Sequence, residues 1–251
     1  MVILWRTLKC LLLSVLFWFL PSTGEENPLK PVALASFPGS GNTWLRYLLQ
    51  QVTGILTGSV YSDYDLMMTS FPAEGVHNSS VLVVKTHEHG PLVWGQFRRA
   101  VLLVRDPQGA ILAEFNRQNA GHLGIASEDL FYEKSWEEFV RNKLISWTDF
   151  HLDWTRNFLQ PIEIVFYEDL VSDLRGSLVR ILRFLQWPVD DKNLDCAIKR
   201  RRGNYKRRQL PFDPFTKSMK DRIDETRNNT FKELKRMERV RKIYFTLFRF
   251  L

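Results

Sequence analysis

A glycine-rich segment near the start of the chain has the composition of an anion-binding loop. It reads Ser36-Phe37-Pro38-Gly39-Ser40-Gly41-Asn42-Thr43-Trp44, and it joins a short apolar run to a segment whose apolar residues recur at helical spacing. A strand, a tight turn and a helix N-terminus in that order present backbone N–H groups and the positive end of the helix dipole to an anion. The same residues also fit an ordinary turn capped by Ser or Asn, so the loop by itself leaves both interpretations open. The candidate anion contacts are Gly39, Ser40, Gly41, Asn42, Thr43 and Trp44.

The loop is shorter than the nucleotide-binding loop of kinases and ATPases, and it lacks the lysine of that loop. The kinase motif reads G-x-x-x-x-G-K-[ST], and its lysine reaches the terminal phosphates. In this chain Gly41 is followed directly by Asn42 and Thr43. A nucleotide kinase is therefore only a weak alternative.

The group Lys85-Thr86-His87-Glu88-His89 offers acid–base chemistry. Because an imidazole titrates near pH ~6.5, His87 can accept the proton of an acceptor hydroxyl close to neutral pH. Lys85 lies two positions earlier, on the same face of a strand, where its charge can stabilise an anionic group during transfer. His87 and His89 could also bind a metal, but no third ligand cluster or cysteine pair accompanies them, so we expect no metal site.

Arginines supply partners for further anionic groups. Arg105 follows an apolar run and can bind a phosphate with its planar fork, or it can form a structural ion pair with Asp106 or Glu114. Further along the chain, seven of the ten residues from 199 to 208 are cationic. Such a segment can clamp a nucleotide phosphate or an acidic glycan, whereas a nucleic-acid tract conflicts with the luminal routing inferred below.

Four apolar runs, rich in β-branched residues or leucine, predict strands at residues 32–36, 81–85, 100–105 and 162–167. Their nearly continuous hydrophobicity is typical of strands buried on both faces. Helical spacing follows at residues 43–51, 107–118, 135–158 and 170–185. This alternation predicts an α/β fold with a central parallel sheet flanked by helices.

Ligands of such sheets bind beyond the carboxyl ends of the strands. The residues that directly follow each predicted strand are therefore candidates for a binding or catalytic site. The glycine-rich loop, His87 and Arg105 each follow one of the predicted strands. The segment Tyr167-Glu168-Asp169 follows the fourth, and we interpret its carboxylates as architectural groups at a helix start. We therefore expect these segments to lie along one rim of the sheet.

Length and charge favour one domain with a polyanionic partner. The 251 residues are 45% hydrophobic, which is enough for a complete core. Residues 197–251 hold 18 Lys or Arg against 6 Asp or Glu, a net of +12, whereas residues 1–196 hold 17 against 22, a net of −5. A basic section on a mildly acidic body predicts a site for a polyanionic ligand or an acidic surface; for the last twenty residues a solvated basic face is an equal alternative.

The N-terminus predicts entry into the secretory pathway. Arg6 and Lys9 precede an uncharged run at residues 10–20. This pattern fits a signal-peptide core, or a short type II membrane anchor spanning residues 2–20. We assign residues 1–24 to this signal or anchor segment.

Two further features agree with a luminal chain. Sequons at Asn78 and Asn228 offer glycosylation sites. Cys196 is the one cysteine beyond the N-terminal segment, so no internal disulfide is expected. We interpret Cys196 as a buried structural thiol, with an intermolecular bridge as the alternative. Residues 25–31 are polar and contain proline, which predicts a short stem before the folded domain.

Taken in their order and spacing, the motifs resemble the sulfotransferase superfamily. That pattern runs from a strand through a P-x-S-G-[TN]-T-W loop to V-K-T-H, R-[ND]-P and F-Y-E-D-L, and an amphipathic helix ending F-L follows. This chain matches it at residues 37–44, 84–87, 105–107, 166–170 and 184–185. Within the superfamily it is most similar to the WSC-domain-containing sulfotransferases, without their cysteine-rich WSC modules, at residues 36–44, 84–88, 113–117, 120–124 and 214–216.

The resemblance implies a P-loop-like sulfotransferase fold over residues 32–251. It implies transfer of a sulfuryl group from 3′-phosphoadenylyl sulfate (PAPS), without a metal, to a hydroxyl of a glycan on a glycoprotein or glycolipid, with sialic acid as one candidate. The implied location is the Golgi membrane, single-pass type II with the catalytic domain in the lumen; secretion after signal cleavage is the alternative. No nucleic-acid partner is expected, and the oligomeric state stays open.

The resemblance also assigns roles by position. The loop from Ser40 to Trp44 would hold the 5′-phosphosulfate of PAPS. His87 would be the general base, and Lys85 would stabilise the sulfuryl oxygens. The 3′-phosphate would be held by Arg105, Arg202, Lys206 and Arg207.

Two positions depart from the superfamily pattern. The lysine of its first loop is Gly39 here, and the serine that follows its arginine by eight positions, on the 3′-phosphate, is Ala113. The WSC-type proteins look similar at both positions, so we interpret the departures as a subfamily trait. The alternative function is a luminal glycan- or nucleotide-binding protein of the same fold with impaired catalysis.

Overall fold

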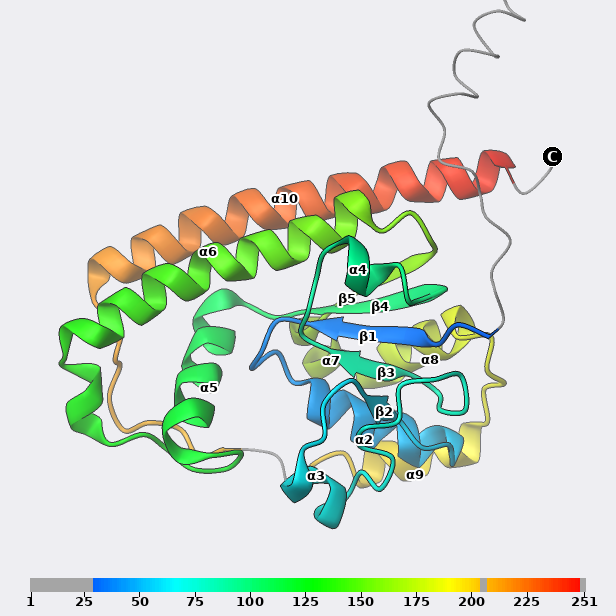
Figure 1. The fold of residues 1–251 in the computed structure, drawn as a ribbon, viewed down its shortest axis with the longest axis horizontal. Coiled ribbons are helices and arrows are strands. Elements are labelled where there is room, and N and C mark those ends of the chain that lie inside the picture. The colour runs from blue at the N-terminus through cyan, green and yellow to red at the C-terminus, as the bar shows by residue number, and fades with distance from the viewer. Residues whose placement is uncertain (1–28, 204–206, 249–251) are drawn as a thin grey trace, which may run out of the picture.

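Five parallel strands form the centre of the molecule (Figure 1). The computed structural model describes residues 29–203 and 207–248. The strands lie in the order β2-β3-β1-β4-β5, and β1 pairs with both β3 and β4. Their bounds are β1 Val32–Ser36, β2 Gly58–Ser59, β3 Val84–Thr86, β4 Arg99–Val104 and β5 Ile162–Phe166. The predicted parallel sheet is confirmed.

Side chains of the central strands alternate between two hydrophobic cores, one on each face of the sheet. Ala33 and Ala35 contribute to one core together with Leu102, whereas Leu34 and Leu103 contribute to the other. All five side chains are fully buried. The continuous hydrophobicity of these runs therefore has the expected cause, which is burial on both faces.

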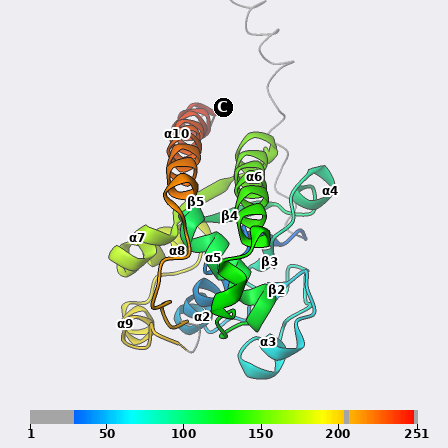
Figure 2. The same cartoon turned by 90° about the vertical axis from the view of Figure 1, so that its left-hand side faces the viewer.

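Helices cover both faces of the sheet, as Figure 2 shows. One layer consists of α5 Pro107–Ala120, α6 Lys134–Asn157 and α10 Lys217–Phe248. The opposite layer consists of α2 Asn42–Thr53, α7 Tyr167–Ser172, α8 Leu174–Phe184 and α9 Asp191–Lys199. The connecting segments contain shorter helices, α3 Tyr64–Thr69 and α4 Pro91–Trp94, and a 3₁₀ turn, η1 Glu128–Phe131.

The structure differs from the predicted elements in two places. The second predicted strand begins later, because β3 pairs with its neighbours only from Val84 onward. The helix expected at residues 170–185 is two helices. Asp173 leaves the helical conformation with ψ 77°, and its carboxylate accepts a hydrogen bond from the N–H of Gly176, which starts α8.

The elements that the sequence did not predict are β2, α3, α4, η1, α9 and α10. The longest of them, α10, lies in the basic section. Charged residues are so frequent there that the few apolar positions do not form a clear helical pattern. Ile223 and Leu234 on α10 are fully buried in the core, and the helix lies along α6 (Figure 1). Tertiary packing against α6 thus stabilises a helix whose amphipathic pattern is weak.

No helix within the described residues has the length and apolarity needed to cross a membrane. The predicted signal or anchor segment, residues 1–24, and most of the predicted stem lie outside the described residues. Both therefore stay predictions.

The expectation of a buried thiol at Cys196 is wrong. Cys196 is exposed on α9, because Leu194 and Ala197 form the buried face of this helix.

Candidate active site

The predicted catalytic and binding residues meet at the carboxyl ends of β1, β3 and β4. His87 follows β3, and its Nδ1 lies 2.7 Å from the carbonyl oxygen of Ser36 at the end of β1. Arg105 follows β4, and its Nη1 donates to the carbonyl oxygen of Gly39 at 2.8 Å. The glycine-rich loop therefore lies between the histidine and the arginine, as the strand-end argument expects.

The loop leads into a helix N-terminus that no side chain caps. Gly41 is the N-cap residue of α2 with φ 93°, and no side-chain hydrogen bond is made there. The hydroxyl of Ser40 is buried and has no hydrogen-bond partner among the described residues. The turn that the sequence left open is present, since the N–H of Ser40 donates to the carbonyl oxygen of Phe37 at 3.2 Å, but no Ser or Asn side chain caps the helix. The N–H groups at the start of α2 and the buried Ser40 hydroxyl thus form a cradle that a bound anion would satisfy.

Gly39 and Gly41 are required by close contacts in this loop. Gly39 has φ 79°, and a Cβ at this position would lie 2.2 Å from the carbonyl oxygen of Ala110 on α5. A Cβ on Gly41 would lie 2.8 Å from the ring of Tyr167. The lysine of the superfamily pattern therefore does not fit at position 39 in this backbone conformation.

We expect that restoring this lysine damages the protein. Gly39→Lys should lower the free energy of unfolding by about 2–5 kcal/mol, because it adds left-handed backbone strain to a clash with Ala110. Urea denaturation measures this loss. Gly54→Lys is the matched control, because Gly54 has φ 69° and nothing lies within 4 Å of its added Cβ, so it carries the backbone strain alone. Equal losses in the two variants would contradict the close contact at Gly39.

The loop side chains of Asn42 and Trp44 have structural partners. The amide of Asn42 donates to the carbonyl oxygen of Leu34 and to the hydroxyl of Ser36, each at 3.1 Å, so this side chain has partners within the protein. Trp44 Nε1 donates to the carbonyl oxygen of Arg201 at 2.6 Å. Trp44 thereby fixes the basic segment against α2, and its ring meets Tyr167 edge-on with centroids 5.7 Å apart.

His87 is held as a neutral base. Because the carbonyl oxygen of Ser36 can only accept, Nδ1 carries the proton, and Nε2 is left with a free lone pair. Burial and then the charge of Lys85 lower the pKa of His87 to about 3. The imidazole therefore stays deprotonated at neutral pH, which a general base requires.

Lys85 is a buried cation without an ion-pair or hydrogen-bond partner among the described residues. The residue is 7% exposed, and its Nζ lies 5.4 Å from the centroid of the Tyr61 ring. Burial lowers the pKa of Lys85. An unpaired ammonium beside His87 is an arrangement that favours a bound anion.

Arg105 does not form the structural ion pair that the sequence left open. Asp106 pairs with Arg227 at 3.0 Å, and Glu114 pairs with Arg117 at 2.7 Å. The guanidinium of Arg105 instead lies 4.5 Å from the centroid of the Tyr167 ring and holds the Gly39 carbonyl. It retains further N–H donors for a phosphate.

In the basic segment, residues 199–208, one of the predicted ligands of the 3′-phosphate has structural partners instead. The three nitrogens of the Arg207 guanidinium donate to the carbonyl oxygens of Ala113, Gly121 and Gly124, so Arg207 holds the end of α5. Arg202 is exposed, and Lys206 lies outside the described residues. The 3′-phosphate roles of these three residues stay predictions.

Sequence reasoning missed the side chains that hold the rim in place. Tyr61 contacts His87 and Glu88 through its hydroxyl. Trp147 and Trp154 on α6 donate to the carbonyl oxygens of Arg105 and Glu88. No spacing in the sequence links α6 to these strand ends, so only the fold reveals the contacts.

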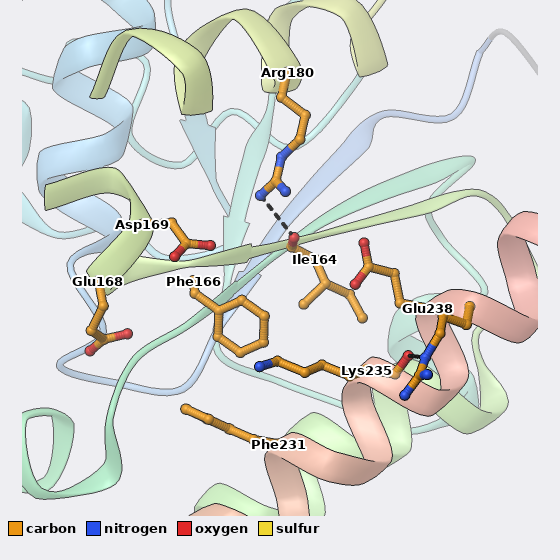
Figure 3. A pocket seen from close by; sticks show the side chains of 9 residues that line it. Ile164, Phe166, Glu168, Asp169, Arg180, Phe231, Lys235 and Glu238 are labelled. Atoms are coloured by element: carbon orange, nitrogen blue, oxygen red, sulfur yellow. Dashed lines mark hydrogen bonds between the residues drawn. The ribbon is translucent and has the colours of Figure 1, made fainter. Parts of the chain in front are cut away.

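A cleft at the outer edge of β5 is separate from this rim (Figure 3). It has a volume of about 480 Å³ and lies between α7, α8 and α10. Its lining contains Phe231 and Lys235 but none of the predicted site residues, and three carboxylates, those of Glu168, Asp169 and Glu238, line it. The lining also contains three cations, Arg180, Lys235 and Arg239, so its charges balance and the cleft has no net charge to attract an anion. We therefore place the anion site at the rim, where Lys85 has no ion-pair partner among the described residues.

The two sequons lie in different settings. Asn78 is exposed in a connecting segment, where its side chain accepts hydrogen bonds from Ser80, and this agrees with a surface site. Asn228 is exposed on α10, but Thr230 of the same sequon is buried. Glycosylation at both positions stays a prediction. The described residues hold no group of three His, Cys, Asp or Glu side chains that could bind a metal.

Comparison with known families identifies the chain. The sulfotransferase domain family matches residues 29–245, which include every element of the sheet. The chain belongs to this family. The glycine-rich loop, His87 and Arg105 all lie within the matched sulfotransferase domain, and their individual roles stay predictions.

The relatives most useful for comparison carry the name of one group within this family. This sulfotransferase is 55% identical over 217 residues to a WSCD family member of Aedes aegypti, covering 84% of this chain and 68% of the relative. It is 54% identical to a WSCD family member of Drosophila melanogaster, covering 82% of this chain and 67% of the relative. The resemblance drawn from the motifs is confirmed.

A solved structure confirms the fold. The mouse sulfotransferase SULT7A1, crystallised with PAP, superposes with a TM-score of 0.56 at 17% identity, covering 86% of this chain and 94% of that one. At this identity the similarity concerns the fold alone.

Proposed function

We propose that this sulfotransferase uses PAPS as its donor and transfers the sulfuryl group to a hydroxyl of a glycan. The observation that carries the proposal is the uncapped N-terminus of α2, with the unpartnered Ser40 hydroxyl, next to a neutral His87. These groups would bind the phosphosulfate and accept a proton at adjacent positions. The PAP in the mouse SULT7A1 structure supports the choice of donor.

Each residue has one task in the proposed reaction. PAPS supplies the sulfuryl group, and its S–O bond to the phosphate breaks as the acceptor oxygen forms a new S–O bond. Nε2 of His87 takes the proton of the acceptor hydroxyl. Lys85 and the N–H groups of the loop stabilise the charge on the sulfuryl and phosphate oxygens, and Arg105 would hold the 3′-phosphate.

The acceptor is proposed to be a glycan on a glycoprotein or glycolipid, with sialic acid as a candidate, in the Golgi lumen. The N-terminal apolar segment and the exposed Asn78 sequon support a luminal, membrane-attached enzyme. The basic section of residues 197–251 supports an acidic partner.

A binding protein of the same fold with impaired catalysis is the second candidate, since Gly39 removes one cation from the loop. Labelled PAPS offered to a panel of sialylated and neutral glycans separates the two candidates. We expect label on at least one glycan. PAP binding without transfer to any glycan would favour the binding protein, and binding of ATP instead of PAP would overturn both.

Arg105→Ala should weaken PAP binding. Loss of a charged hydrogen bond costs about 1.5–3 kcal/mol, which corresponds to a roughly 10- to 150-fold rise in Kd. Isothermal titration measures this change. The control is Arg222→Ala, because Arg222 is an exposed arginine on α10. An unchanged Kd in Arg105→Ala would remove this residue from the donor site.

The pH dependence of transfer should reflect the lowered pKa of His87. Because this pKa is about 3 rather than near 6.5, the base stays deprotonated well below neutral pH. We therefore expect kcat/KM to stay level between pH 7.5 and about 5.5. A fall with its midpoint near pH ~6.5 would show that His87 titrates as an ordinary exposed histidine.

A further inference from the structure

The turn that carries His87 is fixed on two sides. On one side α6 holds it, since Trp154 Nε1 donates to the carbonyl oxygen of Glu88 at 3.0 Å and the carboxylate of Asp153 accepts from the N–H of Gly90 at 2.8 Å. On the other side the backbone N–H of His87 donates a hydrogen bond to the side chain of Tyr61, in the connection from β2 to α3.

Tyr61 contacts the histidine in two ways. Its hydroxyl oxygen accepts a hydrogen bond from the backbone N–H of His87 at 3.0 Å. Its ring stacks on the imidazole, with centroids 5.6 Å apart and planes 25° apart. The ring plane and the backbone of His87 are thus both fixed by one side chain.

The same hydroxyl is itself oriented. It donates to Oε1 of Glu88 at 2.8 Å, so its proton points to Glu88 and its lone pair points to His87. Burial and the Glu88 carboxylate raise the pKa of Tyr61, so the hydroxyl keeps this proton. Lys85 Nζ lies 5.4 Å from the centroid of the same ring. Tyr61 therefore lies against both the proposed base, His87, and the cation proposed to stabilise the sulfuryl oxygens, Lys85.

We propose that Tyr61 is a positioning residue that holds the imidazole of His87 in the orientation in which Nδ1 binds the Ser36 carbonyl and Nε2 faces the acceptor hydroxyl. The inference rests on the proposed function of His87 as the base. Without the hydroxyl, the backbone of His87 loses a hydrogen bond and Glu88 loses its donor, so the Nδ1 contact to Ser36 is populated less. Tyr61 takes no part in the proton transfer itself.

Tyr61→Phe in the full chain tests this role. We expect kcat to fall about tenfold, while the KM for PAPS and the Kd for PAP stay unchanged, because the donor loop is untouched. Tyr64→Phe is the matched control, since Tyr64 is 70% exposed on α3 and should leave kcat unchanged. Unchanged kcat in Tyr61→Phe, or a rise in the Kd for PAP equal to the fall in kcat, would overturn the proposal.

A second readout does not depend on activity. In ¹⁵N-histidine-labelled protein, the His87 signal, assigned by its loss in His87→Ala, should show one tautomer protonated at Nδ1 in the wild type and a tautomer mixture in Tyr61→Phe. An unchanged single tautomer in the variant would overturn the proposal. If the wild type transferred no sulfate, the proposed function would fail while this spectrum still decided the role of Tyr61.

Substitutions at Glu88 test the same role while Tyr61 itself stays in place. In Glu88→Gln the amide oxygen can still accept from the hydroxyl, so we expect wild-type kcat, whereas Glu88→Ala should move kcat and the tautomer in the same direction as Tyr61→Phe by a smaller factor. If Tyr61→Phe failed to fold, a wild-type spectrum for Glu88→Ala would overturn the proposal.

Discussion

Replacing His87 with alanine is expected to lower kcat for sulfuryl transfer by about 10²- to 10⁴-fold, the usual contribution of a general base. The imidazole Nε2 is the proton acceptor, and its neutral form is secured by the Ser36 carbonyl on Nδ1 and by burial. PAP affinity should be retained, because the cradle is formed by the loop and α2 rather than by the histidine. Initial-rate kinetics with labelled PAPS and calorimetry with PAP measure the two quantities.

The control for this variant is His77→Ala, which removes an exposed histidine from a connecting segment. It should leave both kcat and PAP affinity unchanged. Undiminished transfer in His87→Ala would exclude His87 as the base. Loss of PAP affinity together with kcat would instead make His87 a structural residue of the donor site.

Replacing Lys85 with methionine is expected to lower kcat by about 10²- to 10³-fold, as removal of a preorganised charge-stabilising donor does. The loop lacks a lysine at Gly39 and cannot accommodate one there, so the buried and unpaired Lys85 is the ammonium positioned to stabilise the sulfuryl oxygens. Methionine keeps most of the length and apolar volume of the lysine stem. Kinetics with saturating PAPS measure the loss.

Lys85→Met should also change the pH dependence in a defined direction. The charge of Lys85 lowers the pKa of His87, so its removal raises that pKa and moves the acid limb of kcat/KM to higher pH. Lys134→Met, at an exposed position, is the control and should change neither quantity. Full activity in Lys85→Met would require another cation at the reacting group.

The sheet and its rim were predictable because both depend on short-range patterns. The first strand, residues 32–36, is buried on both faces, and such burial is what its continuous hydrophobicity predicts. The strands alternate with helices, and that order places Gly39, His87 and Arg105 at the same edge. The positions of α10 and β2 were not predictable, since α10 depends on packing against α6 and β2 is only two residues long.

The finer geometry of the site depends on contacts between distant segments. Nothing near Asn42 in the sequence shows that its amide points to Leu34, or that Arg207 holds three carbonyl oxygens at the end of α5. Tyr61 lies 26 residues before His87, in a segment without a recognisable motif. Residue types thus predicted the kind of chemistry. Which side chains face the site and which only support it could be assigned only from the fold.

The most direct test is the structure of the protein with PAP bound. We expect the 5′-phosphate to accept hydrogen bonds from the backbone N–H groups of residues 41–44 and from the hydroxyl of Ser40, with Nε2 of His87 facing the acceptor side. PAP in the cleft beside Phe231 and Lys235, or a Ser40 hydroxyl still without a partner, would contradict the proposed donor site.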